Sequence, residues 1–480
     1  MNSPKTSVEP PKELRIDFVP KDAYLSRDYV ALEAERLWSR VWQVACREEE
    51  LKEVGDYVTY EIATDSIIVV RTADGLRAHH NACQHRGRKL TEGCGRTNQF
   101  RCKYHGWRWN IDGSLGAVLD HEDWNGCPDM GADDLHLPAV KIDTWGGFVF
   151  VNMDPDAQPL REFLAPVIEH LDCFEFEKLR YRWYKSVKLP CNWKVAQEAF
   201  NEGYHVAATH PQILSTQGDD RTTSAMHGPH GMFHYLNSKA PIGSPSPRLN
   251  LPFPPDLRPG IIEFHELMER ELKAIYTPRD VKATHRLMDE VSAQTPPMEM
   301  ILKTIDFQRQ AAIDDGAGWP DMSLEQFARA GTDWHVFPNL VMLMYPDGLL
   351  AYRSRPDGDD PDSCIYEIYS LARYAPGTEP PLNREYYHGK DEWRQDTVGK
   401  FGMILSQDFG NMEQVQQGMK SRGFRGSRPS PLQETSVFNF HRELLQYLFG
   451  EAAPKVAQPA AEKEKDLVAG EKAQAKARAL

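Results

Sequence analysis

Residues 83–105 read CQHRGRKLTEGCGRTNQFRCKYH and contain two short metal-ligand patterns. The first pairs Cys83 with His85 across one residue, and the second pairs Cys102 with His105 across two. Sixteen residues lie between His85 and Cys102. Each pattern offers one thiolate and one imidazole, whereas zinc fingers usually group cysteine with cysteine and histidine with histidine.

This mixed ligand set is typical of a two-iron cluster. In a Rieske [2Fe–2S] centre, two cysteine thiolates bind one iron and two histidine imidazoles bind the other. We therefore expect Cys83, His85, Cys102 and His105 to bind one such cluster, with the glycines of this stretch forming tight loops around it. A structural zinc site is the alternative, and absorption and EPR spectra distinguish the two.

Composition limits the class of protein. The chain has 480 residues, a length that favours a folded protein of two or more domains. Its formal net charge of −14 argues against nucleic acid as a partner. We find no apolar run long enough to span a membrane and no basic-then-apolar secretion signal at the start. A cytoplasmic location is expected, and it suits reduced thiols.

The pattern along the chain predicts four parts. Residues 1–39 are expected to form an N-terminal segment whose helical part packs on the larger domain over 156–450. Short strands and glycine-rich turns predict a β-rich cluster domain over residues 40–155. Mixed strand and helix patterns follow in a larger domain over 156–450, with 216–260 as a long loop. Residues 451–480, dominated by Ala, Lys and Glu, predict a disordered or loosely helical tail.

A second metal site is expected near the end of the block Asn192–Pro211. His205 and His210 are five residues apart, which turns the two side chains away from each other on an ideal helix. Pro211 disfavours helical geometry at the preceding residue, so His210 can turn back towards His205. Two imidazoles and one carboxylate form the facial triad of non-haem Fe(II) oxygenases. The carboxylate candidate is Asp408, which lies where we expect a helix to begin.

Each of these residues also has a simpler interpretation. Without the upstream cluster pattern, His205 and His210 would be interpreted as two unrelated histidines. Asp408 would then be interpreted as an acidic residue that stabilises the start of a helix. The upstream cluster pattern favours the metal site, because a carrier of single electrons needs an acceptor. Glu202, three residues before His205, is expected either to orient that histidine or to bond a cluster histidine of another subunit. A solvated surface glutamate is the alternative.

With both sites in view, the chain resembles the α subunits of Rieske non-haem iron aromatic-ring-hydroxylating oxygenases. The resemblance covers roughly residues 20–450. It rests on the four cluster ligands, on the block 192–210 and on the segment around Asp408.

The resemblance implies an α+β fold with a β-rich Rieske domain and a catalytic domain whose antiparallel sheet is wrapped by helices (helix-grip or START-like). It also implies a head-to-tail homotrimer, with or without a small β subunit, in which the cluster of one chain serves the mononuclear Fe(II) of its neighbour. Glu202 would bridge the two sites. A separate reductase, with or without a ferredoxin, would deliver electrons from NAD(P)H, since no nucleotide-binding G-x-G-x-x-G follows a strand here.

The implied activity is O2-dependent hydroxylation of an aromatic or related hydrophobic substrate, with ring dihydroxylation expected first. Most ring-hydroxylating members have Asp at the place of Glu202, and some monooxygenase branches have Glu. A monooxygenase or an O- or N-demethylase on the same scaffold is therefore the alternative. An electron-transfer or metal-binding protein without oxygenase activity is the alternative of another class, and His205, His210 and Asp408 argue against it.

The substrate itself is not predicted. Phe200, Phe233, Phe337 and Leu343 are candidate pocket residues, although residues of this kind are more often ordinary core. His335 is a further candidate for which a core position is expected. We find no group of arginines that would mark a carboxylate-bearing substrate.

Overall fold

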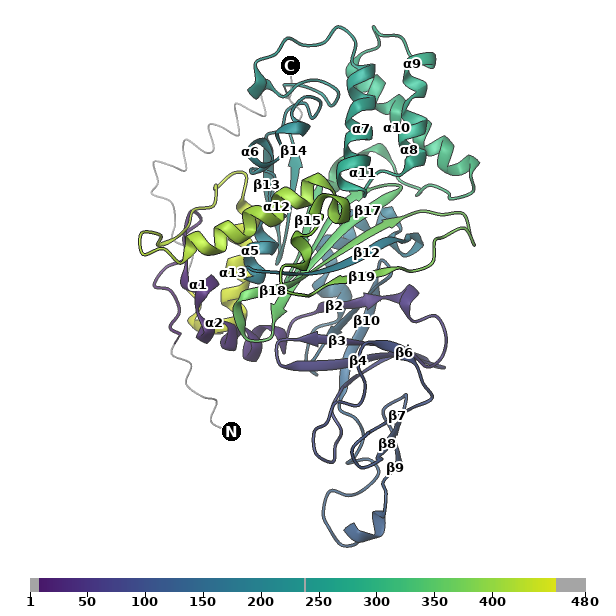
Figure 1. The fold of residues 1–480 in the computed structure, drawn as a ribbon, viewed down its shortest axis with the longest axis vertical. Helices are drawn as coiled ribbons and strands as arrows, with labels where there is room; N and C mark the ends of the chain where they lie inside the picture. Colours follow the sequence, from purple (N-terminus) through teal and green to yellow (C-terminus); the bar gives the residue numbers. More distant parts are fainter. Residues whose placement is uncertain (1–7, 237–238, 455–480) are drawn as a thin grey trace.

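The computed structural model describes residues 8–236 and 239–454. Most of the predicted tail, residues 455–480, lies outside the described residues. Figure 1 shows a β-rich part below a larger part in which helices surround a sheet. This arrangement confirms the predicted α+β class. Within the described ranges, no helix combines the length and the apolar character needed to cross a bilayer.

The β-rich part contains a seven-stranded antiparallel sheet in the order β2-β11-β10-β5-β4-β3-β6. The run Ile67–Val70 is fully buried in the middle of this sheet, where β-branched side chains fit the pleat. A three-stranded sheet, β7-β8-β9, lies at its outer end (Figure 1). The strands are β2 (Gln43–Arg47), β3 (Asp56–Ile62), β4 (Asp65–Thr72), β5 (Gly75–His80), β6 (Cys94–Arg96), β7 (Gln99–Arg101), β8 (Arg108–Asn110), β9 (Leu115–Ala117), β10 (Ala139–Trp145) and β11 (Phe148–Asn152).

The larger part is built on an eight-stranded sheet in the order β13-β14-β15-β16-β17-β18-β12-β19. Its neighbours are antiparallel except β12 and β19, which are parallel. A short antiparallel pair, β1 with β20, joins an early segment of the chain to the segment that follows α12. The strands are β1 (Val19–Pro20), β12 (Arg180–Leu189), β13 (Thr222–His227), β14 (His230–Tyr235), β15 (Asp333–Val336), β16 (Leu340–Tyr345), β17 (Gly348–Asp357), β18 (Asp360–Ala372), β19 (Arg384–Tyr387) and β20 (Gly426–Ser427).

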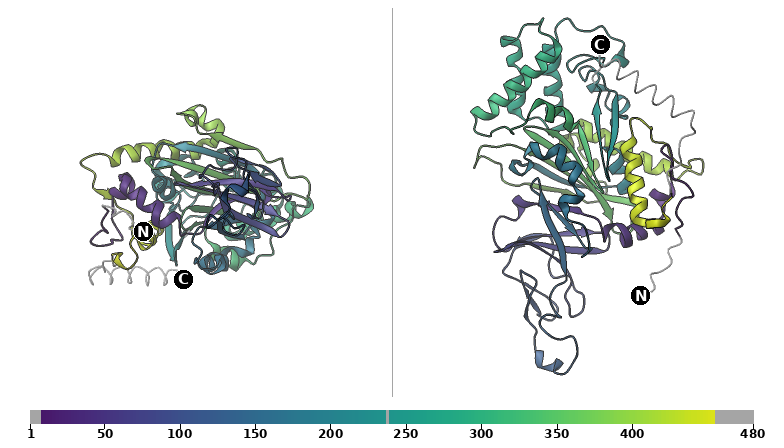
Figure 2. Two further views of the ribbon diagram at one scale, coloured as in Figure 1. Left: turned by 90° about the horizontal axis from the view of Figure 1, so that it is seen from below. Right: turned by 180° about the vertical axis from the view of Figure 1, so that it is seen from behind.

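Helices pack around this sheet (Figures 1 and 2). The N-terminal helices contact β18, α5 contacts β17 and β18, and α13 covers β13 and β14. The helices are α1 (Asp22–Leu25), α2 (Arg27–Glu33) continued by a π-helix (Ala34–Trp38), α3 (Leu160–Phe163), α4 (Ala165–Leu171), α5 (Trp193–Glu198), α6 (Val206–Thr209), α7 (Arg258–Leu272), α8 (Pro278–Thr284), α9 (Arg286–Glu290), α10 (Pro297–Asp314), α11 (Leu324–Ala330), α12 (Thr397–Met419) and α13 (Thr435–Phe449).

The two faces of the large sheet have different partners. On one face, Arg353 forms an ion pair with Glu367 and donates a hydrogen bond to the carbonyl of Ala45 in β2, at 2.9 Å. This face therefore packs against the Rieske part. Side chains alternate along a strand, so Tyr352 and Tyr366 point to the opposite face, where their rings contact Phe200 just after α5.

One sequence expectation about the large domain is wrong. Residues 216–260 are not one long loop, because β13 and β14 form an antiparallel hairpin within them and α7 begins at Arg258. Gly228 occupies the left-handed region at the turn, with φ of 63°. The Gly, Ser and His content suggested a loop, yet strand pairing with β15 determines the local structure.

Candidate functional site

The four predicted cluster ligands lie on two loops. Cys83 and His85 follow β5, and Cys102 and His105 lie in the turn between β7 and β8. Both cysteines are buried free thiols. Figure 1 places β7 and β8 in the lower part of the molecule, far from α6 in the upper part.

The local backbone prepares Cys102 to act as a thiolate. The backbone N–H of Tyr104 points at the Cys102 sulfur, with 3.5 Å between N and Sγ. Burial raises the pKa of Cys102, but hydrogen bonds from the N–H groups of Tyr104 and His105 lower it, and the pKa falls below its ordinary value. Because iron binds the thiolate form, this environment fits a ligand.

The two histidines also fit a cluster. Their ring centroids are 4.6 Å apart, and the ring planes meet at 71°. The Nδ1 atoms of His85 and His105 are buried, and no hydrogen-bond partner reaches either among the described residues. Trp107 stacks on His85 at 4.8 Å, which holds that ring in place. Two thiols and two unpartnered imidazole nitrogens are the donor set of a Rieske cluster.

The structure brings His205, His210 and Asp408 together. One ligand atom from each lies within 4.8 Å of the others. His210 Nε2 is 3.1 Å and His205 Nε2 is 3.7 Å from Oδ1 of Asp408. The second oxygen of Asp408 is buried and has no partner within the described part of the chain. Such a convergence of two imidazoles and one carboxylate fits a mononuclear iron.

The turn between the two histidines has a local cause. His205 precedes the single turn of α6, and His210 follows it with φ of −120° and ψ of 58°. Pro211 disfavours helical geometry at His210. The ring of His210 can therefore face the ring of His205, and their centroids lie 5.3 Å apart.

Both histidines are held through their other ring nitrogen. Glu202 Oε1 lies 2.7 Å from Nδ1 of His205, and Gln407 Oε1 lies 2.8 Å from Nδ1 of His210. Since these oxygens accept a hydrogen bond, Nδ1 carries the proton and Nε2 keeps its lone pair for a metal. Sequence reasoning proposed Glu202 but missed Gln407, whose only signal is its position directly before Asp408.

The electrostatic environment favours a cation at the triad. Burial lowers the pKa of His205, but Glu202 and then Asp408 raise it, and the pKa reaches about 9. Burial, together with the charge of Glu202, raises the pKa of nearby Glu434 to about 7. An iron cation would supply the positive charge that this group of acids favours.

The expected helix start at Asp408 is wrong. Helix α12 begins at Thr397, where Asp396 caps it, and Gly402 interrupts its geometry with φ of 82°. A Cβ at Gly402 would lie 2.1 Å from the carbonyl oxygen of Glu271, so glycine permits the close approach of α12 to α7. Asp408 thus lies in the second turn after the break, and its carboxylate faces His205 and His210 instead of capping a helix.

Phe200 and Phe337, two of the candidate pocket residues, are both buried but have different neighbours. Phe200 contacts Tyr352 at 4.3 Å between ring centroids, near the triad. Phe337 packs instead on Tyr447 of α13 and is 1% exposed, so it belongs to the core. His335 is also buried, and its Nε2 lies 3.1 Å from the carbonyl oxygen of Pro338.

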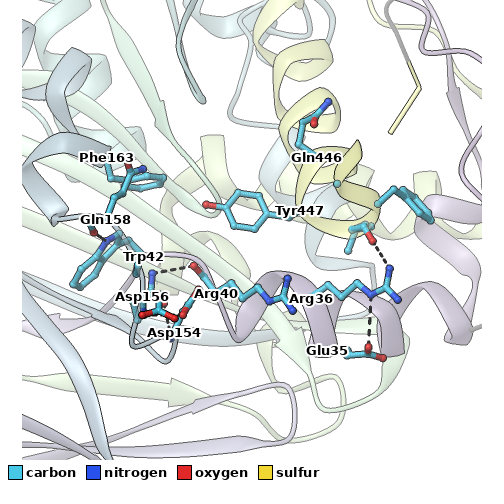
Figure 3. Close-up of a pocket in the computed structure, with 15 residues that line it drawn as sticks. Glu35, Arg36, Arg40, Trp42, Asp154, Asp156, Gln158, Phe163, Gln446 and Tyr447 are labelled. Carbon is cyan, nitrogen blue, oxygen red and sulfur yellow. Dashed lines mark hydrogen bonds and ion pairs between the residues drawn. The ribbon is translucent and has the colours of Figure 1, made fainter. Parts of the chain in front are cut away.

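A different hollow, of about 720 Å³, lies where the π-helix meets the end of the Rieske part and α13 (Figure 3). Arg36 donates to the carbonyl of Leu448 at 2.8 Å, and Trp42 donates to the carbonyl of Gln158 at 2.8 Å. Its lining includes no residue of either metal site. These contacts explain how the segments are held together and identify no ligand.

Comparison with known families decides the identity of the catalytic part. The family model described as "Ring hydroxylating alpha subunit (catalytic domain)" matches residues 176–450, more than half of the chain. The chain belongs to this family. A second model, "Rieske [2Fe-2S] domain", matches residues 41–124. The resemblance inferred from the sequence is confirmed, and the cofactors are a Rieske [2Fe–2S] cluster and a mononuclear non-haem iron, which replaces the zinc alternative.

Individual relatives include both monooxygenases and dioxygenases. The carnitine monooxygenase oxygenase subunit of Escherichia coli (strain K12) is 33% identical over 216 residues, which cover 44% of this chain and 56% of that protein. The chain thus matches only about half the length of that relative. The anthranilate 1,2-dioxygenase large subunit of Acinetobacter baylyi is 27% identical over 379 residues, covering 71% of this chain and 77% of that protein.

Solved structures agree on the fold. The quaternary ammonium Rieske monooxygenase CntA in complex with L-carnitine aligns over 90% of this chain and 95% of that one, with a TM-score of 0.59 and 19% identity. Naphthalene 1,2-dioxygenase from Rhodococcus sp. aligns over the same shares, with a TM-score of 0.58 and 19% identity.

Proposed function

We propose that this chain is the oxygenase component of an enzyme that uses O2 and externally supplied electrons to hydroxylate an organic substrate. The convergence of His205, His210 and Asp408 in a chain that also carries a Rieske domain is the observation that supports this most. When bound, the mononuclear iron supplies O2 activation. The cluster supplies single electrons.

The chain's own residues hold this chemistry in place. His205, His210 and Asp408 would bind the iron, and Glu202 and Gln407 keep the histidine Nε2 atoms directed to it. Glu202 also accepts the backbone N–H of His205 at 3.1 Å, which fixes the carboxylate against the turn. The Nδ1 proton therefore stays between His205 and Glu202.

Electrons are proposed to pass between subunits. The cluster loops lie near β7 and β8, on the opposite part of the molecule from α6 (Figure 1). A head-to-tail homotrimer, with or without a small β subunit, would place the cluster of one chain beside Glu202 of the next. A separate reductase, with or without a ferredoxin, would reduce the cluster. Residues 1–39, 40–155 and 156–450 are proposed as the N-terminal, Rieske and catalytic units of this assembly.

Two outcomes of hydroxylation are considered. Ring dihydroxylation of an aromatic substrate was the first expectation from the sequence, and the anthranilate dioxygenase relative is consistent with it. Monooxygenation or demethylation is favoured by Glu202 at the place of the usual Asp and by the carnitine monooxygenase relative. The two differ in the number of oxygen atoms from O2 that the product carries.

Single turnover under labelled O2 tests the proposal. Holoprotein with a chemically reduced cluster is mixed with candidate substrates and 18O2, and products are measured by mass spectrometry. Two labelled oxygens indicate a dioxygenase, and one indicates a monooxygenase. Asp408→Ala is the matched control, since it should remove mononuclear iron and product while the cluster absorption stays. Wild-type protein that carries only cluster iron and consumes no O2 would show the proposal to be wrong.

A further inference from the structure

One acid near the triad has no hydrogen-bond partner in the part of the chain that the structure describes. Asp333 begins β15, is 1% exposed, and none of the described residues donates a hydrogen bond to either carboxyl oxygen. Buried carboxylates in proteins are normally paired with a cation or with several donors, because an isolated buried charge is strongly unfavourable. Burial alone raises the pKa of Asp333 well above its ordinary value. Among the described residues, no cation or hydrogen-bond donor reaches this carboxyl group, so its charged form is favoured only when a positive group lies beside it.

Strand pairing places Asp333 beside the metal site. It lies directly across from Phe233 in β14, and paired residues have Cβ atoms about 5 Å apart. A Cβ at Gly203 would lie 3.3 Å from the ring of Phe233, and Gly203 is two residues before His205. Phe233 is thus next to Asp333 in the sheet and also close to the segment that carries the first expected iron ligand.

The register also puts Asp333 on the same face of the sheet as Tyr352 and Tyr366. His335 is paired with Val341, and Val341 is paired with Tyr352. Asp333 is two residues before His335, and side chains two apart along a strand share a face. The pKa of Tyr352 is raised by burial, then by the charges of Asp408 and Asp333. Tyr352 therefore lies close enough to both carboxyl groups to interact with them electrostatically.

The surroundings of Asp333 are aromatic, and no cation in the described part of the chain pairs with it. Phe200, Tyr352 and Tyr366 form a ring cluster on this face, and the hydroxyl of Tyr366 is buried without a partner among the described residues. Leu343, directly across from Asp333 on the other side, is only half-buried although its strand is central in the sheet. The side chain of Leu343 is therefore partly accessible on this face.

We propose that Asp333 binds the positive charge of the substrate, and that the substrate class is an organic ammonium compound. This inference rests on the proposed function and specifies what the oxygenase acts on. An ammonium group balances a buried carboxylate and is attracted by the faces of aromatic rings. A neutral arene would leave Asp333 without a partner. The site thus selects for charge as well as for shape.

A pair of probes of equal shape tests this inference. Phenyltrimethylammonium carries a positive nitrogen where tert-butylbenzene carries a neutral carbon. Binding of each probe to anaerobic wild-type holoprotein with Fe(II) is measured by calorimetry. The proposal predicts that the ammonium probe binds at least about tenfold more tightly. Equal affinities, tighter binding of the neutral probe, or binding of neither would overturn it.

The Asp333→Asn variant tests the role of the residue. It should lose the preference for the ammonium probe and keep its affinity for tert-butylbenzene. Asp280→Asn is the matched control, because Asp280 is also buried with a raised pKa but lies in α8, and its probe preference should stay as in the wild type. An Asp333→Asn protein with intact metal content and an unchanged preference would contradict the assignment.

Oxygen consumption separates this inference from the proposed function. Product formation from a neutral arene, with no preference for the charged probe, would refute the ammonium class and leave the oxygenase proposal standing. A clear preference for the charged probe in iron-loaded protein that consumes no O2 with any substrate would support the binding site and refute the oxygenase proposal.

Discussion

Replacing Glu367 with Gln should destabilise the contact between the Rieske part and the large sheet. Glu367 is buried, and its Oε2 lies 2.7 Å from Arg353 and 3.1 Å from Arg355. Arg353 donates to the carbonyl of Ala45, and Arg355 donates to the carbonyl of Glu61, each at 2.9 Å. One carboxylate therefore balances the two arginines that cross to the Rieske strands. Glutamine keeps the shape and removes the charge.

The size of the effect follows from the pKa of Glu367. Burial raises it, but the two arginines and hydrogen bonds to Tyr184 and Arg353 lower it from 4.5 to about 2. At about 1.4 kcal/mol per pKa unit, the native environment stabilises the ionised form by roughly 3 kcal/mol. Leaving buried arginines unpaired typically costs a similar amount, roughly 3–5 kcal/mol. Glu367→Gln should therefore lower the free energy of unfolding by about 3 kcal/mol at pH 7.

The sign of the pH dependence is also defined. The native pKa of Glu367 lies below its unfolded value, so the stabilisation is complete above the unfolded pKa of 4.5 and is lost as the pH falls towards about 2. Glutamine does not titrate. The difference in unfolding free energy between wild type and Glu367→Gln should thus shrink by about half between pH 7 and pH 3.

Urea unfolding followed by tryptophan fluorescence measures both quantities. Glu290→Gln is the control, because Glu290 pairs with Arg286 at the surface and such exposed pairs contribute only about 0.5 kcal/mol. A loss below 1 kcal/mol for Glu367→Gln, or a difference that does not change with pH, would refute the argument that Glu367 balances the two arginines.

Three further predictions concern other contacts. Gln407→Leu should weaken Fe(II) binding about 10- to 100-fold, because His210 loses the oxygen that orients it. Iron analysis after mild chelation measures this loss. Full retention of iron would show that the hydrogen bond from His210 to Gln407 does not support metal binding. Glu202→Gln should slow reoxidation of the reduced cluster, in the presence of O2 and substrate, at least about tenfold. Stopped-flow absorbance of the cluster measures this rate. An unchanged rate would exclude Glu202 from the electron path. Lys194→Met should destabilise the fold by roughly 3–5 kcal/mol, since Glu33, 2.5 Å from Lys194 and equally buried, would lose its cationic partner and keep only the hydrogen bond from Trp193. An unfolding midpoint equal to that of the wild type would show the ion pair to be dispensable.

The expected ligands of the cluster could be inferred from the sequence because each pair of them is local. Cys83 and His85 are two residues apart, and Cys102 and His105 are three apart, so each pair is presented by one short loop whatever the rest of the chain does. The resemblance to the oxygenase α subunits rested largely on such short-range patterns, and it also gave the correct fold class. The change of direction at His210 followed from Pro211, which acts on its immediate neighbour.

Contacts between distant segments could not be predicted in this way. Gln407 meets His210 across 197 positions of sequence, and nothing in its local pattern separates it from any polar helix residue. The break in α12 at Gly402 depends on how closely α7 approaches, so the helix start expected at Asp408 was misplaced.

Asp333 illustrates the division most clearly. From the neighbouring sequence alone, Asp333 is only an acidic residue at the start of a short apolar strand. Pairing of β14, β15 and β16 decides that it faces Phe233 and Leu343 and shares a sheet face with Tyr352. Short-range residue spacing therefore determined the kind of metal centres in this protein, because a chelating loop needs only its own residues. The tertiary structure decided which distant side chains surround them, because strand register and helix packing bring those side chains together only in the folded chain.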